Sequence, residues 1–215
     1  FFSTKDFKEK TQRIMYNSIG PIWEANHMWL IIAIVILFVG FPKVYADLSN
    51  FLHIPLVLML LGIIARGTSF TFRNYDVIKD NWHKLYAVIF TISSLVTPFF
   101  LGIIAASTVS GSIDNTATDF LSAYVYSWLT WFNVSVGIFT VSICGFLASI
   151  FSIHSIDDLT DKQILRNIAK RYSIAIFLTG GIAFIVSFWK QIPLPQWIYS
   201  DWSGYFAVGL ATLSI

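Results

Sequence analysis

The stretch FLSAYVYSWLTWFNVSVGIFTVSICGFLASIFSI, residues 120–153, holds 34 consecutive residues without an Asp, Glu, Lys or Arg. A helix needs roughly 20 mostly apolar residues to cross the hydrocarbon core of a bilayer. As one helix, the stretch would reach ~50 Å, which is too long for a single upright span. We therefore expect the true span at residues 133–153. The aromatic residues ahead of it are typical of the membrane interface; they are Tyr124, Tyr126, Trp128, Trp131 and Phe132.

The composition of the whole chain agrees with a membrane protein. Of 215 residues, 56% are hydrophobic and 12% are charged, and the mean hydropathy is +0.68. A soluble domain carries roughly 25% charged residues, so this chain has too few polar residues to cover a water-exposed surface. The net charge of +2 gives no case for binding nucleic acid.

Further segments have the length and hydropathy of membrane spans. They are residues 22–45, 51–72, 85–109 and 172–189, with an incomplete one at 203–215. The predicted fold is an all-α, polytopic transmembrane helix bundle of five full spans and one truncated span, forming a single integral-membrane domain over residues 1–215. We expect Pro98 to interrupt its segment and a short helix at residues 161–171 to run into the fifth span. Because the chain starts without Met and stops within an apolar run, we also expect a fragment of a longer subunit.

The positions of Lys and Arg predict the orientation. Eleven of the 14 basic residues lie before the first segment or in every second connection after it. The other connections hold only Lys43 and Lys190, and Arg66 lies inside a segment. Since basic residues stay on the cytoplasmic side of a membrane, the N-terminal stretch is predicted to be cytoplasmic.

Ionisable residues inside a span are costly and therefore indicate function. Glu24 and His27 are three residues apart, so they share a helix face, with Trp23 and Asn26 adjoining. They could open a proton path from the cytoplasm, since burial can tune both groups to exchange protons. A polar helix cap at the headgroup level remains an equal alternative.

Arg66 lies in the last third of the segment at residues 51–72, on the same predicted side as Glu24. Adjacent spans run antiparallel, so we expect an intramembrane ion pair between Glu24 and Arg66. The alternative is that Arg66 extends to the interface without a partner.

Other chemistry has weaker support. His53 and His27 would lie at opposite ends of adjacent spans, which argues against shared haem or metal ligation. The single cysteine, Cys144, excludes an internal disulfide and is expected to be a small core residue. The abundant aromatic residues could line a quinone cavity, although interface anchoring is the more common role.

Residues 20–73 resemble subunit II of the cytochrome bd-type quinol oxidases. The matching pieces, in order and spacing, are GPIWE at 20–24, Asn26, WLI at 29–31, LF at 37–38, FP at 41–42, YA at 45–46, residues 58–61, RG at 66–67 and FTFR at 70–73. The remaining helices match that family in hydropathy and charge placement only.

The resemblance implies a subunit of a bacterial inner-membrane oxidase that couples quinol oxidation to oxygen reduction. It implies haems of the b and d type in a partner subunit I, no cofactor in this chain, and quinol as the substrate of the complex. Trp23 and Glu24 match the Trp-acid pair beside the family's proton-entry path, and Arg66 matches a buried arginine. A bound quinone or lipid and a small accessory subunit remain open.

Three departures from the family pattern are visible. Glu24 stands where many members have Asp, which keeps the carboxylate and lengthens its reach. Thr71 stands where many members have an acid, so a role for a second carboxylate is not supported. The family's first helix and its last spans have no counterpart in residues 1–215.

Two alternatives differ from an oxidase subunit. A secondary transporter could use Glu24 and Arg66 as an intramembrane site, although the internal symmetry typical of transporters is missing from the sequence. A structural scaffold could use the same two residues as a fixed ion pair.

Overall fold

The computed structural model describes residues 28–75, 82–113, 119–154, 156, 159–200 and 202–213. These residues form helices and no strand, which confirms the all-α prediction. The helices are Met28–Gly40, α2 (Pro42–Phe51), α3 (His53–Tyr75), α4 (Trp82–Ser110), α5 (Phe120–Tyr124), α6 (Trp131–His154), α7 (Leu159–Trp189), α8 (Leu194–Tyr199) and α9 (Trp202–Leu213).

Four of these helices are long and apolar enough to cross a membrane. The candidate spans are His53–Phe72, Lys84–Ser110, Trp131–His154 and Leu159–Trp189. Met28–Gly40 and α2 would together make a fifth, bent span. The prediction of a polytopic helical membrane protein is therefore confirmed, while α9, with 12 residues, occupies the place of the incomplete last segment.

The first predicted segment, residues 22–45, is not one continuous helix in its described part. The helix ends at Gly40, and α2 starts at Pro42 with its axis turned by 112°. Phe41 between them has φ −135° and ψ 60°. Proline lacks an N–H and disfavours a helical conformation in the residue before it, so Phe41-Pro42 turns the chain. Residues 22–27 of this segment lie outside the described residues.

The long uncharged stretch divides close to the expected place. The short helix α5 is followed by an irregular segment, and α6 begins at Trp131, two residues before the predicted start. The indole Nε1 of Trp128 donates to the Tyr124 carbonyl at 2.8 Å, and Ser127 Oγ donates to the Phe51 carbonyl at 3.2 Å. The first bond ties the irregular segment to the end of α5, and the second attaches it to the end of α2.

Two further expectations about helix continuity have different outcomes. The prediction that Pro98 interrupts its span is wrong, because α4 continues through it as one helix. In membrane helices, neighbouring helices can compensate for a proline, and Pro98 is buried in α4, which packs against both α3 and α6. The expected continuation of the helix at residues 161–171 into the fifth span is confirmed by the 31-residue α7.

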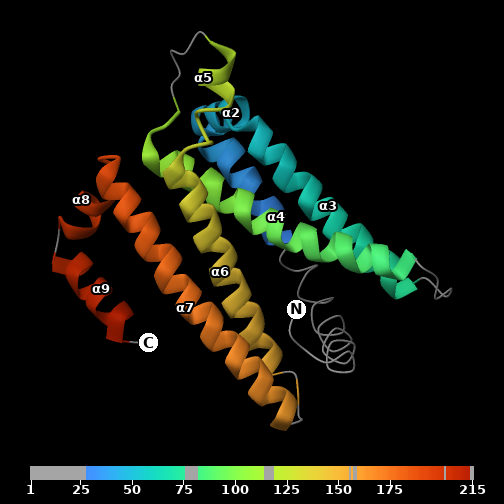
Figure 1. Cartoon of the computed structure of the whole chain (residues 1–215). Helices are drawn as coiled ribbons and strands as arrows, with labels where there is room; N and C mark the ends of the chain where they lie inside the picture. Colours follow the sequence, from blue (N-terminus) through green and yellow to red (C-terminus); the bar gives the residue numbers. More distant parts are fainter. Residues whose placement is uncertain are drawn as a thin grey trace.

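The spans pack as an open row in the order α3, α4, α6, α7, each against the next (Figure 1). Glycine allows close approach: a Cβ built on Gly102 of α4 would lie 2.9 Å from Gly137 Cα of α6. Small residues at helix contacts are typical of membrane bundles. In the most apolar 18 residues of each span, only 11–22% of the residues are buried within the chain. Large apolar faces therefore remain for lipid or a partner.

The open packing also corrects the expectation for Cys144. This residue lies on α6 but is exposed rather than part of a core. A row of helices has two uncovered faces, and apolar positions on them are not buried by the chain itself.

Candidate functional site

Four of the five predicted site residues lie outside the described residues. They are Trp23, Glu24, Asn26 and His27. The proton path that they would open therefore stays a prediction. The fifth residue, Arg66, is described and lies on α3.

Arg66 faces the neighbouring helix within the row. Its guanidinium carbon lies 5.5 Å from the centroid of the Phe90 ring on α4. A cation over an aromatic face is attracted by the ring quadrupole. Phe90 lies inside the candidate span Lys84–Ser110, ~9 Å along the helix from its start. The contact thus lies within a candidate membrane span, about two helical turns from its start.

The electrostatic environment of Arg66 is sparse within the part of the chain that the structure describes. The Cys144 sulfur of α6 lies close enough to interact electrostatically with the guanidinium. None of the described carboxylates lies close enough to interact with it. The predicted ion pair with Glu24 involves a residue outside this part and stays a prediction.

The described histidine side chains do not fit shared ligation of a haem. His53 opens α3, where its Nδ1 lies 2.9 Å from the Asn50 carbonyl and its ring contacts Tyr124 edge-on. His154 ends α6, at the opposite end of the spans. The two ends are separated by the length of a helix, ~36 Å. Among the described residues no group of three or more His, Cys, Asp or Glu could hold a metal ion.

A buried amide joins three segments at the end of the bundle that carries α5, here named the α5 end. Asn133 of α6 is 0% exposed. Its Nδ2 donates to Ser107 Oγ of α4 at 2.9 Å and to the Trp128 carbonyl at 3.0 Å. Sequence reasoning placed Asn133 at the start of a span without assigning it a contact. An uncharged residue gives no charge signal, so only the tertiary structure reveals its partners.

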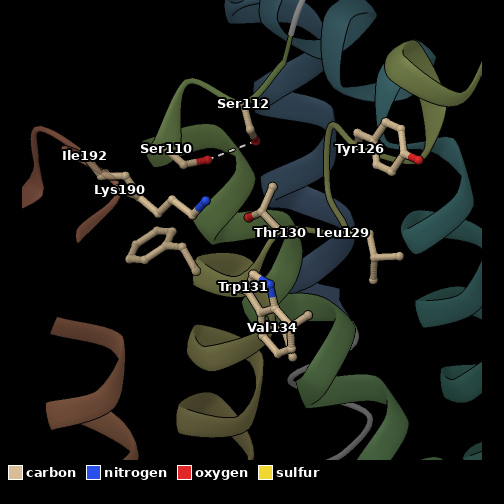
Figure 2. A pocket seen from close by; sticks show the side chains of 10 residues that line it. Ser110, Ser112, Tyr126, Leu129, Thr130, Trp131, Val134, Lys190 and Ile192 are labelled. Carbon is tan, nitrogen blue, oxygen red and sulfur yellow. Dashed lines mark hydrogen bonds between the residues drawn. The ribbon is translucent and has the colours of Figure 1, made fainter. Parts of the chain in front are cut away.

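A cavity of about 610 Å³ opens beside this amide, where α4 ends, α6 begins and α7 ends (Figure 2). Lys190 is the one charged residue in its lining. In Figure 2 its ammonium group extends toward Ser110 and Thr130. The full lining is Ser110, Ser112, Tyr126, Leu129, Thr130, Trp131, Phe132, Val134, Lys190 and Ile192. The sequence did not predict this cavity, although Lys190 is one of only two basic residues assigned to this side of the membrane.

The sequence profile of the family described as cytochrome bd terminal oxidase subunit II matches residues 1–215. The chain belongs to this family. The resemblance found in residues 20–73 is thereby confirmed and extends over the whole chain.

Individual relatives agree with the family. The chain is similar to the cytochrome bd ubiquinol oxidase subunit 2 of Bacillus subtilis strain 168, with 30% identity over 173 residues, which are 79% of this chain and 49% of the relative. It is similar to the cytochrome bd-I ubiquinol oxidase subunit 2 of Escherichia coli K12, with 27% identity over 135 residues, 61% of this chain and 35% of the relative. The chain thus spans about half the length, or less, of these curated relatives.

In this member of the subunit II family, two regions have polar contacts that the structure describes: Arg66 and the α5 end. Arg66 is held by an aromatic contact inside the row of spans. Asn133 and the cavity lie together at one end of that row. These two regions are the candidate functional sites among the described residues.

Proposed function

We propose that this chain is subunit II of a bacterial terminal oxidase that oxidises quinol and reduces oxygen to water. The observation that carries the proposal is the family match over residues 1–215. Quinol oxidation releases electrons and protons, and oxygen reduction consumes both. A membrane complex that takes the consumed protons from the cytoplasm builds a membrane potential.

The proposal assigns the haems, of the b and d type, to a partner subunit I. This assignment rests on the family match. The exposed apolar faces of the row support a large membrane partner, since helices with 11–22% of their residues buried need other apolar surface or lipid around them. The N-terminal stretch would lie in the cytoplasm, as the Lys and Arg distribution predicts.

Glu24 is proposed to take up protons at the cytoplasmic end of this subunit, with Trp23, Asn26 and His27 around it. A carboxylate within a membrane needs a positive or hydrated neighbour. Arg66 is a candidate for that neighbour, because its guanidinium lies over the Phe90 ring within a candidate span and none of the described carboxylates neutralises it.

Glu24→Gln tests the proton path in the assembled complex. We expect quinol-driven oxygen uptake to slow on the order of tenfold or more, since a positioned proton-transfer group typically contributes at least that much. Glu9→Gln is the matched control, because Glu9 lies before the first predicted span and its loss should leave turnover unchanged.

The readouts separate the path from the subunit assignment. Slow turnover with normal haem content supports the path. Normal turnover with normal haem content removes the path and leaves a structural subunit. If deleting this chain left quinol-driven oxygen uptake intact, that result would contradict the subunit assignment itself.

A further inference from the structure

The cavity at the α5 end lies where the spans meet the membrane interface. α4 ends at Ser110, α6 begins at Trp131 and α7 ends at Trp189. The side chains of Trp131 and Trp189 are 75% and 83% exposed. Exposed tryptophans at the ends of spans are typical of the headgroup level of a bilayer. The cavity therefore opens toward lipid headgroups.

A strained turn fixes Lys190 at this cavity. Gln191 has φ 53°, the one positive φ among the described non-glycine residues. Its N–H donates to the Phe188 carbonyl at 3.2 Å, and the Ile192 N–H donates to the Ser187 carbonyl at 3.1 Å. This bonding closes the end of α7 as a Schellman motif, in which glycine usually takes the left-handed position. The turn places Lys190 and Ile192, on either side of Gln191, in the lining of the cavity.

The lining is cationic and polar on one part and apolar on the other. Lys190 supplies a positive charge, and no lining residue is a carboxylate that would neutralise it. Thr130 Oγ1 accepts a bond from the Asn133 N–H at 3.2 Å, so its own hydroxyl hydrogen remains available to donate. The apolar walls come from Leu129, Val134 and Ile192.

We propose that this cavity binds the phosphate of an anionic phospholipid from the membrane leaflet at the α5 end. Lys190 pairs with the phosphate, the Thr130 hydroxyl donates to it, and the apolar walls pack against the first atoms of the acyl chains. A phosphodiester on a glycerol with acyl chains is charged at one end and apolar at the other, as this lining is. The volume of 610 Å³ falls within the usual range of small-molecule sites, roughly 300–1,000 Å³.

This site is separate from the proposed oxidase function. It requires only that the α5 end lie in a membrane. Lys190 also sits at the carboxyl end of α7, where the helix dipole favours a cation. Stabilising the helix dipole would need no ligand, and the experiment below distinguishes this role from lipid binding.

The test measures lipid binding to the purified, delipidated complex by native mass spectrometry. The probe is short-chain phosphatidylglycerol, and the variants are Lys190→Gln, Lys190→Arg and Lys43→Gln. Lys43 is the matched control, because it is the other basic residue of this side, is exposed on α2 and does not line the cavity. Inorganic phosphate and the matching diacylglycerol are separate arms.

We expect Lys190→Gln to weaken phosphatidylglycerol binding about fivefold, because it removes the charge-assisted bond from the ammonium group to the phosphate. Lys190→Arg and Lys43→Gln should bind as the wild type does, and diacylglycerol binding should not change with residue 190. Equal binding by Lys190→Gln and the wild type would overturn the proposal. Inorganic phosphate binding as tightly as the lipid would also overturn it, because the site would then be a free-phosphate site.

Discussion

Arg66 and Asn133 are polar residues inside apolar helices, and the sequence distinguishes them only by charge. A charge within a span is visible in the sequence, so Arg66 was predicted as a site residue. Its aromatic partner was not, because the contact with Phe90 joins positions on two helices that meet only in the fold. Asn133 gave no such signal, yet it is fully buried and bonds two other segments. Lys190 was visible as a basic residue on the less basic side, but its cavity was not.

The contact between Arg66 and Phe90 should be measurable as a coupling energy. We expect Phe90→Leu to lower the free energy of unfolding by about 0.5–2 kcal/mol in the wild type and by clearly less when residue 66 is already Met. The double-mutant cycle is read by SDS titration of the folded protein in mild detergent. Equal effects of Phe90→Leu in both backgrounds would show that the ring contributes apolar packing alone.

Asn133→Ala should destabilise the α5 end. The substitution removes the amide donor of the Trp128 carbonyl and one of the two bonds of Ser107 Oγ, which keeps its bond to the Ile103 carbonyl. A buried polar group that loses its partner costs about 1–3 kcal/mol. Asn50→Ala is the control, since Asn50 is exposed and only its backbone carbonyl has a described bond, to His53. The same unfolding titration checks the difference, and two equally stable variants would contradict the proposed role of the amide.

At the scale of elements, most helices follow from hydropathy and length, and the errors lie at prolines. Residues 85–109 and 172–189 fall within α4 and α7, because long apolar runs leave little choice but a helix in a membrane. Phe41-Pro42 breaks its segment, whereas Pro98 does not. The difference depends on neighbours: Pro98 is buried between packed helices and Pro42 is exposed. Packing of this kind cannot be read from one segment alone.

The close approach of α4 and α6 predicts a strong effect at Gly102. A Cβ there would lie 2.9 Å from Gly137 Cα and would also meet Thr140, so Gly102→Ala should destabilise the fold by about 1–3 kcal/mol. Gly181 of α7 has no atom within 4 Å of such a Cβ, and Gly181→Ala should be neutral or slightly stabilising. Unfolding titrations that rank the two variants in the reverse order would argue against this helix contact.

The strained end of α7 predicts a stabilising substitution. Gln191→Gly should raise the free energy of unfolding by up to about 1 kcal/mol, because glycine adopts φ 53° without a Cβ clash. Gln191→Ala keeps the Cβ and should change stability little. A destabilised Gln191→Gly variant would mean that the Gln191 side chain itself stabilises the turn.

The described spans form an open row whose faces are mostly uncovered by the other described residues (Figure 1). Composition and charge placement predicted its membrane character, and the family match confirms the resemblance seen in residues 20–73. A subunit of this shape depends on a partner or on lipid to cover its apolar faces.

The central claim, that this chain functions within a haem-containing quinol oxidase, is tested most directly by purifying the natural complex through a tag on this chain. The measurement is the reduced-minus-oxidised visible absorption spectrum of the purified material, followed by quinol-driven oxygen uptake. We expect haem bands of the b and d type, a co-purified partner subunit that carries them, and oxygen uptake that starts on addition of quinol. A colourless, monomeric protein without oxygen uptake would contradict it.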